Sequence, residues 1–246
     1  MFEFRRATLE SCAEATGTVI VIDVLRAFTT AAYAFHAGAE AITVVAQVEE
    51  AFALREQHPR WLIMGEQAGL PVEGFDYNNS PAAFIDQDLT GRHLVQRTSS
   101  GTQGIVRSRR ANRVLAASLC CARATAAYVC QLRPKQVTMV ITGSHSEGLG
   151  DEDQACADYL EALIRRELVD LERIIERVRT SRAARKFADP ERPQFSPLDL
   201  DYAIDVDRFS CAMVARAEGD QRVMRPVPVG QSSCGAVCDV CSTGEG

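Results

Sequence analysis

The sequence lacks any hydrophobic run that could cross a membrane. A spanning helix needs about 20 consecutive apolar residues, and no such run occurs among the 246 residues. Near the amino end, Arg5 and Arg6 have no apolar stretch behind them, which argues against a secretory signal. We therefore expect a soluble cytoplasmic protein that does not bind membranes.

An excess of basic residues is also missing. The chain has 27 lysine and arginine residues against 33 aspartate and glutamate residues, and its formal net charge is −6. Binding to nucleic acid phosphates requires a basic face. The one locally basic stretch, 165–192, alternates arginine with acidic residues, as a solvated helix surface does. The sequence therefore predicts that the protein does not bind nucleic acid.

Cysteine, by contrast, is well represented, with nine residues. Cysteines inside helices and strands of an intracellular protein usually serve as small core residues. We interpret six of the nine in this way: Cys12, Cys120, Cys121, Cys130, Cys156 and Cys211.

The other three cysteines, Cys234, Cys238 and Cys241, lie in a tail rich in glycine and serine, with C-x₃-C-x₂-C spacing. This spacing resembles the cluster loop of radical S-adenosylmethionine enzymes, although those enzymes carry it early in a barrel. A zinc site would need a fourth ligand, from Cys211 or from a second subunit. A flexible tail without ligand, a metal site and a redox cluster stay open, and we favour the first.

Apolar runs alternate with helical periods along most of the chain, which predicts an α/β protein with a three-layer α/β/α fold and a mostly parallel or mixed sheet. We expect one domain over 1–231, with a proline-rich loop at about 187–198 and a flexible tail at 232–246. Strands are predicted near 18–24, 41–46, 61–65, 92–97, 113–117 and 136–142, and a last one ends at 227–230. Helices are predicted near 27–37, 48–57, 80–86, 101–108, 120–132, 151–167, 168–186 and 199–205.

The first predicted strand ends in Asp23, and Arg26 follows at the start of a helix. Ligands of α/β proteins bind at the carboxyl ends of the strands. Aspartate is a hard oxygen ligand for Mg²⁺, and arginine grips a phosphate or sulfonate through two parallel hydrogen bonds. The alternative is a helix-capping aspartate beside a surface arginine.

Acidic and amide side chains follow the third predicted strand. Glu66 comes directly after an apolar run, and the segment 74–81 contains Asp76, Asn79 and Ser80. Helix capping explains Ser80 but gives no reason for Asp76. Glu66 and Asp76 are therefore candidate functional carboxylates, with Asn79 and Ser80 as candidate substrate ligands.

A hydroxyl-rich turn follows the fourth predicted strand and opens a helix. Backbone N–H groups in such a turn can bind a phosphate-like anion, and an ordinary serine-rich cap is the alternative. The candidate substrate-binding residues here are Arg97, Thr98, Ser99, Ser100, Gly101 and Thr102.

The sixth predicted strand leads into a loop with His145 and a helix that starts with Asp151, Glu152 and Asp153. These acids suit the positive end of a helix dipole, but Glu152 or Asp153 could also bind a cation. His145 is a candidate general acid or base. Because all these clusters follow strands, a parallel sheet would gather them at one edge, which favours Mg²⁺-assisted chemistry on a small phosphorylated anion.

The order of these motifs resembles the 2-phosphosulfolactate phosphatases, the ComB family of coenzyme M biosynthesis. The matching segments are 21–30, 65–66, 74–81, 98–102 and 143–153. The resemblance implies a homodimeric, Mg²⁺-dependent enzyme that hydrolyses 2-phospho-3-sulfolactate to 3-sulfolactate and phosphate. On this basis we expect a site built from Asp23, Arg26, Glu66, Asp76, Ser80, Thr98, Gly101, Thr102 and Glu152. The expected metal ligands are Asp23, Glu66, Asp76 and Glu152, and the expected catalytic residues are Asp23, Arg26, Glu66 and Asp76.

One departure from the family lies in the turn, where Ser99 and Ser100 replace a threonine and an asparagine of the usual Thr-Thr-Asn-Gly-Thr. This change leaves open another phosphorylated hydroxy acid as substrate. A noncatalytic anion-binding or regulatory protein on the same fold is the other alternative. Asp23, Glu66 and Asp76 argue against it, because anion binding alone would not favour three carboxylates.

Overall fold

The computed structural model describes residues 2–143 and 150–230. His145 and the three tail cysteines lie outside the described residues. No helix within the described ranges has the length and apolar character needed to cross a membrane.

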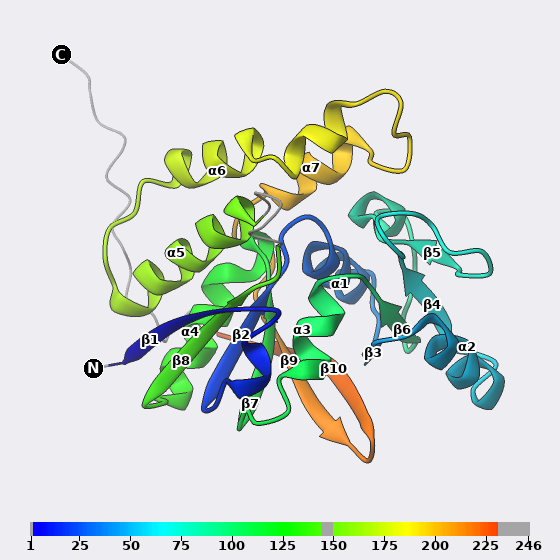
Figure 1. Ribbon diagram of the computed structural model, residues 1–246, viewed down its shortest axis with the longest axis horizontal. Coiled ribbons are helices and arrows are strands. Elements are labelled where there is room, and N and C mark those ends of the chain that lie inside the picture. Colours follow the sequence, from blue (N-terminus) through cyan, green and yellow to red (C-terminus); the bar gives the residue numbers. More distant parts are fainter. Residues whose placement is uncertain (1, 144–149, 231–246) are drawn as a thin grey trace.

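One mixed sheet of ten strands forms the centre of the protein, in the order β1-β8-β2-β7-β9-β10-β3-β6-β4-β5 (Figure 1). Strands β9 and β10 run antiparallel to each other and to their neighbours β7 and β3, and the remaining pairs are parallel. The strands are β1 Glu3–Thr8, β2 Thr18–Ile22, β3 Ala41–Val45, β4 Leu62–Gly65, β5 Tyr77–Asn78, β6 His93–Arg97, β7 Arg113–Ala117, β8 Gln136–Ile141, β9 Cys211–Glu218 and β10 Gln221–Pro228.

Helices cover both faces of this sheet. The α-helices are α1 Ala27–His36, α2 Val48–Gln57, α3 Gly101–Arg107, α4 Ala122–Leu132, α5 Asp151–Arg165, α6 Leu171–Thr180 and α7 Pro197–Ala203. Shorter 3₁₀ segments are η1 Cys12–Glu14, η2 Pro81–Phe84, η3 Leu119–Cys121 and η5 Ala184–Ala188.

The side chains of β2 show how the three layers are held together. Val19 and Val21 point into a core shared with α1 and α3, whereas Ile20 and Ile22 point into a second core shared with α4 and α5. All of β2 is buried, because a central parallel strand is covered on both faces. The expected three-layer α/β fold with a mixed sheet is therefore confirmed.

Several elements differ from the sequence-based prediction. The strands β1, β5 and β9 were not expected, the helix expected near 80–86 is the 3₁₀ segment η2, and the helix expected over 168–186 ends at Thr180. Strand β1 carries exposed charged side chains, which removes the apolar signal, because it is an edge strand paired only with β8. The proline-rich segment is shorter than expected, since α7 begins at Pro197.

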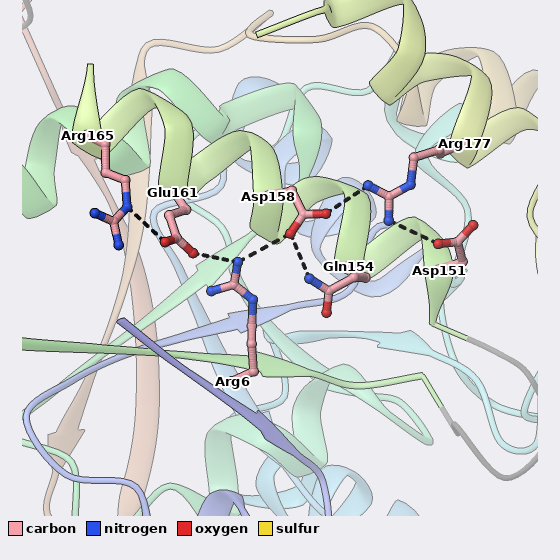
Figure 2. A network of polar contacts seen from close by, with 7 residues as sticks. All are labelled: Arg6, Asp151, Gln154, Asp158, Glu161, Arg165 and Arg177. Carbon is pink, nitrogen blue, oxygen red and sulfur yellow. Dashed lines mark hydrogen bonds and ion pairs between the residues drawn. The ribbon is translucent and has the colours of Figure 1, made fainter. Parts of the chain in front are cut away.

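A row of ion pairs fastens β1 and α6 to the outer face of α5 (Figure 2). Asp158 of α5 accepts hydrogen bonds from Arg177 at 2.8 Å, from Gln154 at 2.7 Å and from Arg6 at 3.3 Å. Burial opposes ionisation, but the bonds from Arg177, Gln154 and Arg6 outweigh it and lower the pKa of Asp158. Because α5 also carries acidic residues at its start, this network helps to fix their position.

Replacing Asp158 with Asn is expected to lower the free energy of unfolding by about 1 kcal/mol at neutral pH, the upper end for partly exposed ion pairs. A carboxylate with a lowered pKa stabilises the fold above its unfolded pKa and loses that effect as the pH falls through the folded pKa. The difference between wild type and Asp158→Asn should therefore shrink on acidification. Urea unfolding at several pH values checks this, and a difference that stays constant with pH would contradict it.

Candidate active site

The carboxyl ends of several parallel strands meet at one edge of the sheet. Asp23 follows β2, Glu66 follows β4 and Thr98 follows β6. Strands β2 and β6 are not neighbours in the sheet. Their carboxyl ends are linked through α1, which follows β2, and α3, which follows β6. Gln96 of β6 donates a hydrogen bond of 2.8 Å to the carbonyl of Ala27 in α1. The expected convergence on one edge is therefore present for these groups.

Asp23 is buried between the starts of α1 and α3. Its Oδ1 accepts a hydrogen bond of 2.9 Å from the amide of Ala27, so the helix-capping interaction is real for one oxygen. A Cβ on Gly101 would lie 2.8 Å from Oδ2, which shows how closely α3 approaches this carboxylate. Burial, together with the negative charge of Glu66, raises the pKa of Asp23 to about 6 against opposing hydrogen bonds.

Glu152 and Asp153 open α5 beside Asp23, and their side chains differ in their partners. Asp153 accepts the amide of Val24 at 2.8 Å and the amides of Thr142 and Gly143 at 3.2 and 3.1 Å. Asp153 therefore ties α5 to the ends of β2 and β8.

Glu152 has no such set of partners. It is 4% exposed, and its Oε2 is buried without a hydrogen-bond partner within the described residues. Burial and the neighbouring charges of Asp23 and Asp151 raise its pKa. A buried carboxylate oxygen without a donor carries a large desolvation cost, which a bound cation would offset.

Glu66 is held in one orientation by the segments on either side of it. Oε1 accepts the amide of Ser99 at 2.5 Å, and Oε2 accepts the amide of Gly69 at 2.5 Å and the hydroxyl of Ser99 at 3.1 Å. Arg97 braces the same strand ends by donating to the carbonyls of Glu66 at 2.7 Å and Ala46 at 3.3 Å. The serine at position 99, where the family usually has threonine, therefore contacts Glu66 through its hydroxyl group.

The turn over 98–102 is also tied within the protein. The amide of Thr102 donates to the Thr98 hydroxyl at 3.1 Å, and the amide of Thr98 donates to the Thr102 hydroxyl at 2.9 Å. The amide of Ser99 is taken by Glu66. The sequence predicts that the turn presents its N–H groups to an anion. In the structure, side chains of the protein accept these three N–H groups instead.

Arg26 and Ser80 both bind Asp199, a residue that the sequence did not point out, and Asn79 directly precedes Ser80. Arg26 Nη1 donates to Asp199 at 2.7 Å, and the Ser80 hydroxyl donates to the other carboxylate oxygen of Asp199 at 2.6 Å. Asn79 is 5% exposed and its Oδ1 lacks a partner within the described residues. Asp199 sits in the first turn of α7, where acids are common, so no pattern distinguished it.

Asp76 is not brought into this group. It accepts the amide of Ile63 at 2.7 Å and pairs with Arg55 of α2. Its own amide donates to the carbonyl of Ile63, three residues before Glu66, which corresponds to about 10 Å along a strand. The sequence predicts Asp76 in the site, and the structure places it elsewhere. Asp76 precedes β5, whereas Asn79 follows it at the end of the strand where the site lies.

The carboxylates of the cluster are buried. Its carboxylates at Asp23, Glu66 and Glu152 are at most 6% exposed. A cavity of about 1060 Å³ lies elsewhere, between β1 and the ends of α4 and α5, and its lining includes Arg133 and Arg166 but none of these carboxylates.

The raised pKa of Asp23 gives a testable pH dependence. A carboxyl group whose folded pKa lies above its unfolded value adds stability at low pH, and this contribution is lost as the pH rises through the folded pKa, here about 6. In the presence of a chelator, the Tm of Asp23→Asn minus that of wild type should therefore increase from pH 5 to pH 7 by several degrees. Scanning calorimetry checks this, and a pH-independent difference would contradict it.

Comparison with known proteins gives a consistent result. A sequence model of the family described as 2-phosphosulpholactate phosphatase matches residues 5–215. A probable 2-phosphosulfolactate phosphatase of Bacillus subtilis is 37% identical over 202 residues, which cover 82% of this chain and 88% of that protein.

Further relatives carry the same name. The protein of Synechococcus sp. (strain WH7803) is 35% identical over 156 residues, covering 61% of this chain and 62% of its own length. The protein of Carboxydothermus hydrogenoformans is 37% identical over 146 residues, covering 59% and 60%. These two matches span less than two thirds of the length of each relative, whereas the match to the Bacillus subtilis protein spans most of that protein. The chain belongs to the 2-phosphosulpholactate phosphatase family.

Proposed function

We propose that the protein hydrolyses the phosphate monoester of a small anionic 2-hydroxy acid in a Mg²⁺-dependent reaction. The proposed substrate is 2-phospho-3-sulfolactate, and the products are 3-sulfolactate and phosphate. The observation that carries the proposal is the buried Oε2 of Glu152, which lies beside Asp23 and has no hydrogen-bond partner among the described residues. The names of the relatives support the choice of substrate.

The donor set fits Mg²⁺, which takes oxygen ligands and commonly uses one or two protein carboxylates plus water and substrate phosphate. No group of three or more His, Cys, Asp or Glu side chains arranged to hold a metal occurs in the parts of the chain that the structure describes. We therefore propose Asp23 and Glu152 as the protein ligands. Glu66 adds negative charge nearby. When bound, the ion would neutralise charge on the phosphate.

The remaining groups would bind and orient the substrate. Arg26 presents a buried guanidinium, and the buried side chain of Asn79 carries an NH₂ group that can donate to an anion. Ser80 and Ser100 add hydroxyl groups at the same edge. Arg26 and Asn79 are buried, and fixed charges act more strongly in a buried site than they would in solvent.

Substrate preference is tested with a panel of phosphate esters at saturating Mg²⁺. The panel contains 2-phospho-3-sulfolactate, 2-phospholactate and 2-phosphoglycerate, which share the ester but differ in the second anionic group. We expect the highest kcat/KM for the sulfonated ester. Equal rates for all three would overturn the proposed substrate but not the reaction class, and no release from any of them would overturn both.

A homodimeric, cytoplasmic enzyme that serves coenzyme M biosynthesis is the corresponding proposal for its assembly and setting. Sedimentation equilibrium tests the first part. A monomer at micromolar concentration would contradict it.

A further inference from the structure

The segment that follows η5 is built into the candidate site. The Arg26 guanidinium lies 4.7 Å from the centre of the Phe195 ring and 5.5 Å from that of Phe187. Arg26 Nη1 also donates to the carbonyl of Gln194 at 2.9 Å. Phe195 reaches the loop after Glu66, since a Cβ on Gly69 would lie 3.1 Å from its ring. The segment thus contacts Arg26 on one side and the loop that follows Glu66 on the other.

Asp199 lies in the first turn of α7, directly after this segment, and is fully buried, at 0% exposure. One carboxylate oxygen accepts Arg26 at 2.7 Å, and the other accepts the Ser80 hydroxyl at 2.6 Å and the amide of Ala82 at 3.3 Å. A single carboxylate therefore joins the start of α1, the start of η2 and α7.

We infer that Asp199 is a positioning residue, which orients Arg26 toward the anionic substrate. The inference rests on the proposed function, because it takes Arg26 as a ligand of that anion. A buried arginine can reach several rotamers at similar cost, and a charge-assisted bond to a fixed carboxylate selects one of them. The second bond, to Ser80, fixes the carboxylate itself.

The alternative role for Asp199 is to neutralise the buried charge of Arg26. The two roles make opposite predictions for anion binding. If Asp199 only compensates charge, its removal leaves a more electropositive pocket that binds anions more tightly. If Asp199 positions Arg26, its removal weakens binding because the guanidinium loses its orientation.

The test is a double-mutant cycle on Asp199→Asn and Arg26→Gln in the full chain, with inorganic phosphate as the probe in calorimetry. Loss of a charged hydrogen bond corresponds to roughly a 10- to 100-fold change in a binding constant. We expect Asp199→Asn to raise the Kd for phosphate by this factor, and to add nothing in the Arg26→Gln background. Unchanged or tighter binding, or additive effects, would overturn the inference.

Two further variants complete the experiment. Asp205→Asn removes an aspartate that pairs with Arg208 on the surface, and it should leave the Kd unchanged. Asp199→Glu keeps the charge but shifts the carboxylate by one methylene, so it should bind phosphate more weakly than wild type and more tightly than Asp199→Asn. If Asp199→Asn does not fold, a wild-type Kd in folded Asp199→Glu would overturn the inference.

Binding and turnover separate this inference from the proposed function. Phosphate binding with the expected coupling, but no ester hydrolysis by wild type, would overturn the proposed function and support positioning by Asp199. Hydrolysis by wild type with an unaltered KM in Asp199→Asn would support the proposed function and overturn the positioning role.

Discussion

Replacing Asp23 with Asn is expected to reduce Mg²⁺-dependent phosphate release by roughly a thousandfold or more, the scale seen when a main electrostatic group of an active site is lost. The variant should still fold, because the asparagine oxygen can accept the hydrogen bond that Ala27 donates to Oδ1 at 2.9 Å. Removing a buried charge next to Glu66 and Glu152 should also relieve repulsion. Steady-state release of phosphate and the Tm are the two measurements.

The matched control for this substitution is Asp205→Asn, which removes the same charge from an exposed site that pairs with Arg208. It should retain full activity. Activity close to wild type in folded Asp23→Asn would remove Asp23 from the proposed metal ligands.

Replacing Gly101 with Ala is expected to impair both stability and activity. The added Cβ would lie 2.7 Å from Ala27 Cβ and 2.8 Å from Asp23 Oδ2, both closer than normal contacts. Overpacking of this kind costs about 1–3 kcal/mol, and a shift of the reacting groups by about 1 Å can lower the rate about a hundredfold. Urea unfolding and kcat report the two effects separately.

Gly230→Ala is the control, because no atom of the described residues lies within 4 Å of its added Cβ. It should match wild type in both measurements. If Gly101→Ala were as stable and as active as wild type, the close approach of α3 to Asp23 described above would be wrong.

The parts of the fold and site that were predictable are those with a strong local signal. The apolar run of β2 and the turn at Gly101 identified Asp23 and the start of α3, since parallel strands of an α/β protein place functional groups at their carboxyl ends. Glu66 followed by the same reasoning. For Glu152, its position at the start of a helix indicated a cation ligand only as one of two interpretations.

The remaining features depend on contacts between distant segments. Asp76 was expected in the site, but the two-residue strand β5 is too short to show a periodic pattern, so the side of it on which Asp76 falls was hidden. Asp199 lies 173 positions from Arg26 in the sequence, and only folding brings the two together. The antiparallel pair of β9 and β10 enters the middle of the sheet, an arrangement that no local sequence signal encodes.

The most direct measurement is phosphate release from 2-phospho-3-sulfolactate by wild-type protein, first freed of metal by a chelator and then supplied with Mg²⁺. We expect no release from the metal-free protein and recovery of turnover on addition of Mg²⁺, because a cation is needed to bring the substrate phosphate next to Asp23 and Glu152. Release that is equally fast with chelator would contradict a metal-dependent role for this carboxylate cluster.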